Sequence, residues 1–205
     1  MIELKNVKKS FGDRVLYENL NLTVTDGEFA VLIGASGCGK TTLLDIIAGI
    51  EPIDSGEVIV DGLNIQKRRN RLAYYQTNLG MCFQNFALIE NMTVRKNLEL
   101  VQKKSRSDMS NEDALRRVGM SEYIDKKVCT LSGGEQQRVA LARLMVKKCS
   151  IILADEPTGS LDAVNASKVM DILSDLNKMG KTVVMVTHDT KYQKIGSRQI
   201  DLMKI

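Results

Sequence analysis

A glycine-rich segment followed by a lysine and two threonines carries the clearest chemical signal in the sequence. It satisfies the pattern GxxxxGK[ST] and directly follows an apolar run. Glycines let backbone N–H groups wrap around a phosphate, and the start of a following helix adds partial positive charge. The lysine can reach the outer phosphates, and the first threonine hydroxyl can bind Mg²⁺. We therefore predict a nucleoside triphosphate site formed by Gly34, Ala35, Ser36, Gly37, Cys38, Gly39, Lys40, Thr41 and Thr42.

Acidic and imidazole side chains follow two later apolar runs. Asp155 and Glu156 come directly after residues 151–154, and His188, the single histidine, comes soon after residues 183–186. One carboxylate beside a phosphate loop can hold the Mg²⁺ shell, and another can orient or deprotonate water. Two acids at a strand end can also simply cap the next segment, and a lone histidine is more often structural than functional. Their position after neighbouring predicted strands favours a shared site.

The sequence LSGGEQQR at residues 131–138 predicts a second anion site. Ser132 can cap a helix with Glu135 completing a capping box, while Gly133 and Gly134 expose amide groups at the positive end of that helix. The simpler alternative is a well-capped helix without a ligand. Two copies of the chain arranged head to tail would let each second site close over the partner's nucleotide, with twofold symmetry.

Alternating residues near the N-terminus predict the first structural element. Leu20, Leu22 and Val24 alternate with polar residues and lead into a turn at Asp26-Gly27. This pattern is typical of antiparallel strands with one face in water. The first part of the chain is therefore expected to form an antiparallel β subdomain.

Three continuous apolar runs, at residues 29–33, 151–154 and 183–186, are typical of strands buried on both faces. A helix that ends at Gly49 follows the first run, and a helix that ends at Gly180 lies between the other two. Strands that alternate with helices predict a parallel sheet with its chemistry at the carboxyl ends of the strands. The core is therefore expected to be of the α/β class.

A mostly helical pattern occupies the region between residues 85 and 150. Within it, a capping box from Ser110 to Asp113 and a stop at Gly119 define one helix. We expect this region to form an inserted α-helical subdomain.

The composition is that of a globular protein. The chain has 205 residues, is 43% hydrophobic and carries a formal net charge of +4 at pH 7. This small basic excess does not favour nucleic acid as a partner, and the basic run at residues 67–71 is typical of an exposed face. No apolar stretch reaches the roughly 20 residues of a membrane-spanning helix, and the N-terminus lacks a signal peptide, so we expect the chain to stay in the cytoplasm.

The cysteines are expected to be reduced thiols. Cys38, Cys82, Cys129 and Cys149 are widely spaced and form no CxxC pair. This spacing argues against both a zinc site and a disulfide framework.

Over nearly its whole length, the sequence resembles the ATP-binding domains of ABC transporters. In the order and spacing of that family it has the phosphate loop, Gln84, LSGGEQQR, Asp155-Glu156, Ser160-Leu161-Asp162 and His188. The resemblance implies an α/β fold of the P-loop NTPase (RecA-like) class, with a parallel-sheet core, an N-terminal antiparallel β subdomain and an inserted α-helical subdomain. It implies one domain over residues 1–205. The core would cover about 1–84 and 150–205, and the helical subdomain with LSGGEQQR about 85–149.

The resemblance also implies roles for the site residues. Glu156 would be the catalytic base, His188 would contact the γ-phosphate, and Gln84 would link Mg²⁺ and water to a membrane partner. Phe11 would stack on adenine, although a phenylalanine near a strand end is as often a core residue, and Asp162 would communicate across a dimer. The implied ligands are ATP, bound also by Ser132, Gly133 and Gly134, and Mg²⁺, held by Thr41, Gln84 and Asp155.

Two segments resemble one branch of the family. Residues 83–88 (FQNFAL) and 154–162 (ADEPTGSLD) are similar to the lipoprotein-releasing, macrolide-export and cell-division branch. The chain departs from that branch at Gly196-Ser197-Arg198, which leaves the pairing of the final strand open. The resemblance implies an ATP hydrolase that dimerises with a second copy or a related subunit. This dimer would drive a separate membrane permease, as an exporter, from the inner face of the cell membrane.

Two other classes of protein compete with this interpretation. A soluble ABC ATPase could act on ribosomes or DNA, but such relatives usually carry two of these domains or a long coiled coil, and neither is found in this sequence. A P-loop kinase would explain the glycine-rich loop but not LSGGEQQR. The residues that identify a transported substrate are expected to lie in the permease.

Overall fold

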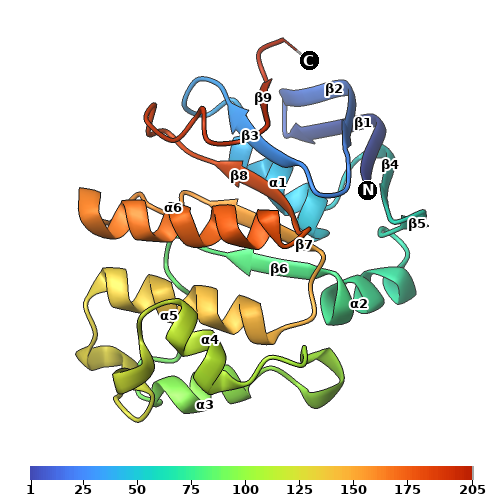
Figure 1. Cartoon of the computed structure of the whole chain (residues 1–205). Helices are drawn as coiled ribbons and strands as arrows, with labels where there is room; N and C mark the ends of the chain where they lie inside the picture. The colour runs from blue at the N-terminus through green and yellow to red at the C-terminus, as the bar shows by residue number, and fades with distance from the viewer. Residues whose placement is uncertain (205) are drawn as a thin grey trace.

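The computed structural model describes residues 1–204, which form two β-sheets with helices packed around them (Figure 1). Ile205, the last residue of the expected domain, lies outside the described residues. The four-stranded sheet is antiparallel, and its order is β2 (Arg14–Val24), β1 (Ile2–Phe11), β4 (Ser55–Val60) and β5 (Leu63–Asn64). The five-stranded sheet is parallel, and its order is β6 (Leu79–Cys82), β7 (Ile151–Asp155), β8 (Thr182–Val186), β3 (Phe29–Ile33) and β9 (Arg198–Asp201).

Helices connect the strands of the parallel sheet and fill the region between β6 and β7. The α-helices are α1 (Lys40–Ala48), α2 (Arg68–Thr77), α3 (Val94–Glu99), α4 (Asn111–Arg117), α5 (Gly133–Val146) and α6 (Ala163–Lys178). Short 3-10 helices occur at η1 (Lys103–Ser105), η2 (Ser121–Tyr123) and η3 (Val128–Thr130). Within residues 1–204, no helix combines the length and the apolar content needed to cross a bilayer.

The parallel sheet is buried on both faces. In β3, Phe29 and Val31 join one hydrophobic cluster, while Ala30 and Leu32 join the other. Successive side chains of a strand point to opposite faces, so a continuous apolar run is what a sheet covered on both sides requires. The predicted α/β core is confirmed.

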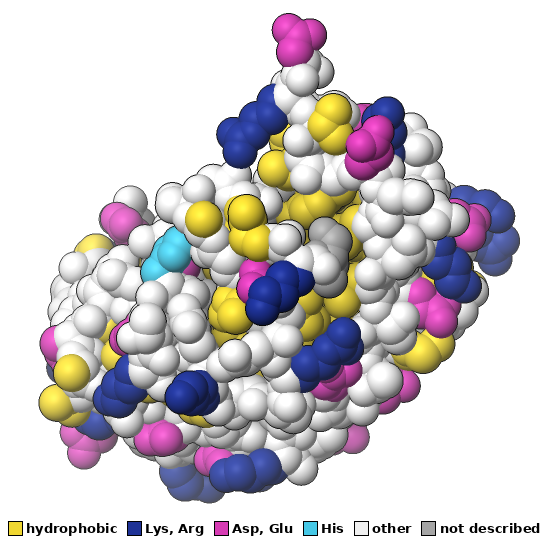
Figure 2. All heavy atoms as spheres, turned by 90° about the horizontal axis from the view of Figure 1, so that it is seen from above, with side chains coloured by type: hydrophobic (Ala, Val, Ile, Leu, Met, Phe, Trp, Pro, Cys, Tyr) yellow, Lys and Arg dark blue, Asp and Glu magenta, His cyan; other side chains and the backbone are white. Residues whose placement is uncertain are grey.

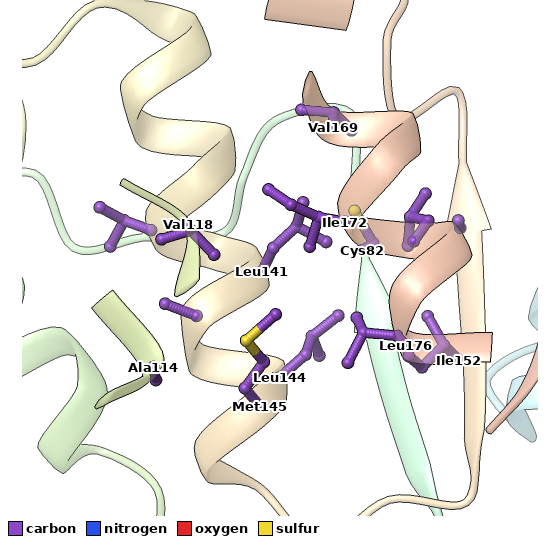
Figure 3. Close-up of a cluster of buried hydrophobic side chains, with 14 of the residues drawn as sticks. Cys82, Ala114, Val118, Leu141, Leu144, Met145, Ile152, Val169, Ile172 and Leu176 are labelled. Atoms are coloured by element: carbon purple, nitrogen blue, oxygen red, sulfur yellow. The ribbon is translucent and has the colours of Figure 1, made fainter. Parts of the chain in front are cut away.

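One face of this sheet is covered by α5 and α6. Figure 3 shows Leu141 and Leu144 of α5 directed toward Ile172 and Leu176 of α6. These four side chains are buried, so α5, which begins within LSGGEQQR, is fixed against the core by ordinary apolar packing.

The other face is covered by α1 and the antiparallel sheet. Leu20, Leu22 and Val24 of β2 are buried together with Leu43 and Ile47 of α1. The polar residues between those β2 positions are exposed, as the alternation predicts. The predicted N-terminal antiparallel sheet is confirmed, and it lies at the opposite end of the molecule from α3, α4 and α5 (Figure 1).

The strand order determines which loops meet. β8 lies between β3 and β7, so His188, which follows β8, lies between the glycine-rich loop after β3 and Asp155 at the end of β7. Functional groups of parallel α/β sheets gather at this carboxyl edge. The predicted grouping of these motifs therefore follows directly from the fold.

The region between β6 and β7 contains short helices joined by turns. Ser110 caps α4, since its hydroxyl accepts a hydrogen bond from the N–H of Asp113 at 3.0 Å, and Gly119 follows with φ +67°. The predicted capping box is wrong in its second bond. A capping box requires the Asp113 carboxylate to accept from the main-chain N–H of Ser110, whereas here it accepts from the Ser110 hydroxyl at 2.7 Å. An aspartate is one methylene shorter than the glutamate that usually completes a capping box.

Helix α2 was not predicted, and the pairing of the final strand was left open. The basic run at residues 67–71 is largely exposed, as expected, but it also opens helix α2. The final strand β9 pairs in parallel with β3, which settles the pairing that the sequence left open. Ser197 helps to hold it there, because its hydroxyl accepts a hydrogen bond from the N–H of Phe29 at 3.1 Å.

Candidate nucleotide-binding site

The glycine-rich loop connects β3 to α1 and closes around its own lysine. Lys40 is buried, and its Nζ donates hydrogen bonds to the carbonyl oxygens of Gly34 (2.9 Å) and Ala35 (2.8 Å). Gly39 has φ +104°, and a Cβ there would lie 2.6 Å from the Tyr17 hydroxyl. That hydroxyl donates to the carbonyl oxygen of Gly39 at 3.0 Å, so the loop is tied to β2 where only glycine fits.

A hollow of about 450 Å³ lies beside this loop. Phe11 lies at its rim, is 49% exposed and has its ring centre 4.4 Å from Nζ of Lys9. The alternative that Phe11 is a core residue is therefore wrong, and stacking on adenine stays a prediction. The residues that line the hollow are Phe11, Arg14, Leu16, Ser36, Gly37, Gly39, Lys40, Thr41, Thr42 and His188.

The β1–β2 hairpin contributes residues that the motifs do not reveal. Nη2 of Arg14 donates to the carbonyl oxygen of Gly37 at 2.7 Å, and Leu16 packs close to Gly39. The one signal that could have revealed Arg14 is the pairing register of β1 with β2, since Arg14 pairs directly with Phe11 across the hairpin. Any arrangement that brings Phe11 to the loop therefore brings Arg14 as well.

Thr41 and Asp155 meet where α1 begins and β7 ends. The Thr41 hydroxyl donates to Oδ1 of Asp155 at 3.3 Å. Burial raises the pKa of Asp155, and the hydrogen bond from Thr41 opposes that rise. A hydroxyl and a carboxylate are hard oxygen ligands that suit Mg²⁺. Among residues 1–204, no group of three His, Cys, Asp or Glu could hold a metal by itself, so the pair fits an ion that takes its other ligands from phosphate and water.

Glu156 and His188 face each other at the ends of β7 and β8. The main-chain N–H of His188 donates to Oε2 of Glu156 at 3.2 Å, and Nε2 of the imidazole lies 3.3 Å from Oε1. That second approach is not aligned as a hydrogen bond, so Oε1 is a buried oxygen without a hydrogen-bond partner. Burial raises the pKa of Glu156, and the bond from the His188 N–H partly offsets this.

The backbone at Glu156 is strained. Its φ is +45°, in the left-handed region that residues with a side chain rarely adopt. The Glu156 N–H still donates to the carbonyl oxygen of Val186 at 3.1 Å, which keeps the residue attached to β8. The Glu156 carboxylate faces the imidazole of His188, whose side chain is 58% exposed and is the cyan group in Figure 2. Strain of this kind gathers at functional sites.

Gln84 lies on a neighbouring hollow of about 590 Å³. That hollow is shared by Asp155 from the end of β7 and by Gly133 from the start of α5. The residues that line it are Phe83, Gln84, Asn85, Phe86, Gly133, Asp155 and Ser160. Gln84 and Asp155, both predicted metal ligands, thus line the same hollow.

The LSGGEQQR segment forms the predicted capping box at the start of α5. The N–H of Ser132 donates to Oε2 of Glu135 at 2.8 Å, and the N–H of Glu135 donates to the Ser132 hydroxyl at 3.4 Å. Ser132 is exposed and Gly133 is half-buried. Neither Ser132 nor Gly134 lines the hollow beside the glycine-rich loop, whereas Gly133 lines the neighbouring hollow with Gln84 and Asp155.

Asp162 caps α6 and belongs to a network that the sequence did not reveal. Its carboxylate accepts hydrogen bonds from the N–H of Asn165 at 2.9 Å and from the Asn165 side chain at 2.6 Å. These bonds lower the pKa of Asp162, the bond to the Asn165 N–H having the largest effect. Oδ1 of Asn165 in turn accepts from Nη1 of Arg138 at 2.7 Å, and a Cβ on Gly134 would lie 2.5 Å from Asn165. Asn165 therefore joins the starts of α5 and α6.

Known proteins match the chain over most of its length. The family model described as ABC transporter matches residues 17–159. The spermidine/putrescine import ATP-binding protein of Pasteurella multocida is 40% identical over 210 residues, which cover 100% of this chain and 56% of that protein. The macrolide export ATP-binding/permease protein of Escherichia coli is 38% identical over 213 residues, covering 98% and 33%.

A solved structure agrees with the fold as well. A dimeric ATP-binding cassette in a post-hydrolysis state with ADP and Pi is similar at a TM-score of 0.83 and 35% identity, covering 98% of this chain and 94% of that one. The chain spans about half the length of the first curated relatives it matches, 56% and 55%. The matched region includes the glycine-rich loop, Gln84, LSGGEQQR and Asp155-Glu156. The chain therefore belongs to the ABC transporter family, in which it forms an ATP-binding domain of the ATPase type with a P-loop NTPase fold.

Proposed function

We propose that this protein is the ATP-hydrolysing subunit of an ABC transporter and that it drives a separate integral membrane permease. The observation that carries the proposal is the partly buried Glu156 carboxylate, held beside His188, which lines the hollow at the glycine-rich loop. An unpaired carboxylate oxygen in that place can accept a proton from a water aligned with the outer phosphate. His188 then contacts that phosphate.

The remaining groups of the loop bind the nucleotide. Lys40 exchanges its bonds to the carbonyl oxygens of Gly34 and Ala35 for bonds to the outer phosphates, and the loop N–H groups surround the phosphates. Phe11 stacks on the adenine ring. When bound, Mg²⁺ neutralises phosphate charge, and the residues that would hold it are Thr41, Gln84 and Asp155.

The second anion site acts on a partner chain. The start of α5, with Ser132, Gly133 and Gly134, does not line the hollow beside the loop of its own chain. We infer a head-to-tail dimer in which each α5 start closes over the nucleotide of the other chain, with Asp162 and its bond to Asn165 near the contact. Dimeric relatives such as the cassette with ADP and Pi support this arrangement.

Gln84 connects the nucleotide to the permease. It lies beside Asp155 on one side, and the region that begins after it leads into α3 and α5 on the other. We propose that residues 1–84 and 150–205 form the nucleotide-binding core and that residues 85–149 form a subdomain that moves with the docked permease. The protein would then act at the inner face of the cell membrane.

Export is the proposed direction of transport. It rests on the likeness of residues 83–88 and 154–162 to the export and lipoprotein-releasing branch, and one similar protein is named as a macrolide exporter. Other similar proteins are named as importers of spermidine/putrescine and of Fe(3+) ions.

Affinity purification from the membranes of the source cell tests the proposal. Tagged Glu156→Gln chain with ATP present should retain a protein with several membrane spans, and adding that protein to wild-type chain should change the ATPase rate. Recovery of ribosomal proteins or DNA, with no membrane protein in the preparation, would favour the soluble ATPase instead.

A further inference from the structure

A buried lysine lies behind the exposed phenylalanine at the rim of the hollow beside the glycine-rich loop. Nζ of Lys9 is 4.4 Å from the centre of the Phe11 ring and lies over one face of it. Lys9 is 5% exposed and does not line the hollow, whereas Phe11 is 49% exposed and does line it. One face of the ring is therefore covered by a cation, and the other face is open to the hollow.

The ammonium of Lys9 is held in place by the segment that follows α1. It forms an ion pair with the carboxylate of Glu51 and donates to the carbonyl oxygen of Pro52 at 2.9 Å. An ammonium group has three donors, so these two bonds leave the third for the ring. The segment is itself attached to β1, because the N–H of Asp54 donates to the carbonyl oxygen of Lys8 at 2.9 Å. The fold thus determines where the cation lies.

The β1–β2 hairpin holds the ring at the rim. Phe11 pairs with Arg14 across the hairpin, and Nη2 of Arg14 donates to the carbonyl oxygen of Gly37 at 2.7 Å. The hairpin is therefore tied to the glycine-rich loop at the same point where Lys9 supports the ring. Ring, cation and loop form one connected unit beside the hollow.

A cation over one face of an aromatic ring changes what the other face attracts. The π electrons make both faces of a ring negative, which opposes the face-to-face stacking of two rings. An ammonium group draws this negative charge toward its own face, so the open face of Phe11 becomes less negative. That face then stacks more favourably on a flat nucleobase, and the contact with the cation also limits the rotation of the ring.

We propose that Lys9 is a positioning residue that orients and polarises Phe11 for stacking on adenine, and that it thereby sets the affinity for the adenosine part of ATP. The inference rests on the proposed function, which places adenine on Phe11. Because Lys9 contacts the ring and does not line the hollow, it should act only through Phe11. A lysine that merely ties β1 to the segment after α1 would affect the stability of the fold instead.

Calorimetric titrations of the whole chain with Mg-ADP and with Mg-pyrophosphate separate the two parts of the nucleotide. Lys9→Met keeps the length of the side chain and removes its charge. It should weaken ADP binding by about two- to tenfold, the range that the geometry of an aromatic pair is worth, and leave pyrophosphate binding unchanged. In steady-state ATPase assays, the same variant should raise KM for ATP and retain kcat.

A double-mutant cycle tests whether Lys9 acts through the ring. Phe11→Leu alone should weaken ADP binding, and adding Lys9→Met to it should cause no further loss. Lys9→Arg should restore most of the wild-type affinity, because a guanidinium group also binds the face of an aromatic ring. Lys5→Met makes the same change at an exposed lysine of β1 that is paired with Glu3, and it should leave the binding of both ligands unchanged.

A second variant keeps the test valid if Lys9→Met is poorly folded. Lys9→Met leaves the Glu51 carboxylate without its partner, which destabilises a chain. The variant Lys9→Met/Glu51→Gln removes both charges. It should have a Tm closer to that of wild type and should bind ADP as weakly as Lys9→Met does.

The possible results separate this inference from the proposed function. Wild-type ADP affinity in the folded Lys9 variants would overturn the inference. An undiminished effect of Lys9→Met in the Phe11→Leu background would also overturn it. A parallel loss of ADP and pyrophosphate binding would leave Lys9 with a structural role alone. If Phe11→Leu weakens ADP binding and the Lys9 variants do not, the proposed stacking stands and this inference fails, whereas wild-type ADP affinity in Phe11→Leu removes both.

Discussion

His188 approaches the carboxylate of Glu156 from two directions. Its main-chain N–H donates to Oε2 at 3.2 Å, and its imidazole Nε2 lies 3.3 Å from Oε1 without forming an aligned hydrogen bond. One oxygen is thereby fixed while the other remains an unused acceptor in a buried place. A carboxylate that is oriented but not saturated is suited to accept a proton from water.

Replacing Glu156 by glutamine should abolish turnover and preserve ATP binding. The amide keeps the size and much of the hydrogen bonding of the carboxylate but cannot accept a proton at neutral pH. We expect kcat to fall by about 10²- to 10⁴-fold. Single-turnover hydrolysis and nucleotide-binding titrations measure the two effects separately. A variant that hydrolyses ATP within a few-fold of wild type would show that Glu156 is not the base.

The same substitution should stabilise the folded chain at neutral pH. Burial raises the pKa of Glu156 above its usual value of 4.5, so the folded state holds the proton more tightly than the unfolded state does. This contribution to stability is complete below pH 4.5 and is lost as pH rises through the raised value. Thermal unfolding should therefore give a higher Tm for Glu156→Gln than for wild type at pH 7, and the difference should vanish on acidification.

The exposed Glu122 offers a matched control for this measurement. Glu122→Gln makes the same chemical change on the surface and should leave Tm unchanged. A destabilised Glu156→Gln variant at pH 7 would mean that the carboxylate stabilises the fold, contrary to the burial argument.

Short sequence patterns were sufficient to predict the parts of the fold that depend on residues close together in the sequence. The apolar run at residues 29–33 is a strand buried on both faces, and Gly49 ends α1 in the left-handed conformation. Ser132 and Glu135 form the capping box that their spacing predicts. Each of these depends on side-chain periodicity or on hydrogen bonds between residues close in sequence.

Contacts between distant segments could not be predicted in the same way. The contact of Arg14 with Gly37 depends on how the β1–β2 hairpin is placed over the loop, and that placement depends on packing of the antiparallel sheet on α1. The bond from Arg138 to Asn165 depends on the packing of α5 against α6. The strained φ of Glu156 has no sequence signal either, because tertiary contacts impose it on a residue that does not favour it.

Lys40→Ala should weaken nucleotide binding itself. In the structure this ammonium is the charged group enclosed by the glycine-rich loop, bonded to two of its carbonyl oxygens. Losing a charged hydrogen bond to phosphate should reduce ATP affinity by about tenfold or more. Isothermal titration calorimetry measures the ATP affinity. Lys148→Ala, at an exposed position, is the control for the loss of one charge. Wild-type affinity in Lys40→Ala would contradict the assignment of the phosphate loop.

Cys38 should react with alkylating reagents in a nucleotide-dependent way. It lies within the loop, is half-buried, and its Sγ is 3.9 Å from Nζ of Lys40. Modification should abolish ATP binding, and bound Mg-ATP should protect the thiol. The exposed Cys129 should react with and without nucleotide, and the buried Cys82 and Cys149 should react slowly in both conditions. Mass spectrometry that finds Cys38 equally modified in both states would refute the placement.

Activity should depend on a dimer with two composite sites. Ser132 lies at the start of α5, outside the hollow that its own loop forms. For the isolated chain, specific activity should therefore rise with protein concentration below the dimerisation constant, because only the dimer brings both halves of a site together.

Mixing two inactive variants tests the composite site directly. Lys40→Ala leaves α5 intact, and Ser132→Arg leaves the glycine-rich loop intact but places a bulky cation where α5 should meet the nucleotide. In a heterodimer, the loop of the Ser132→Arg chain meets the α5 start of the Lys40→Ala chain, which gives one complete site and one doubly defective site. Activity should return on mixing, in proportion to the heterodimer measured by native mass spectrometry. Ser132→Arg also removes a helix cap worth about 1 kcal/mol, so its Tm must show that it is folded. A concentration-independent rate, with no activity where heterodimers form, would exclude the composite site and favour a chain that acts alone.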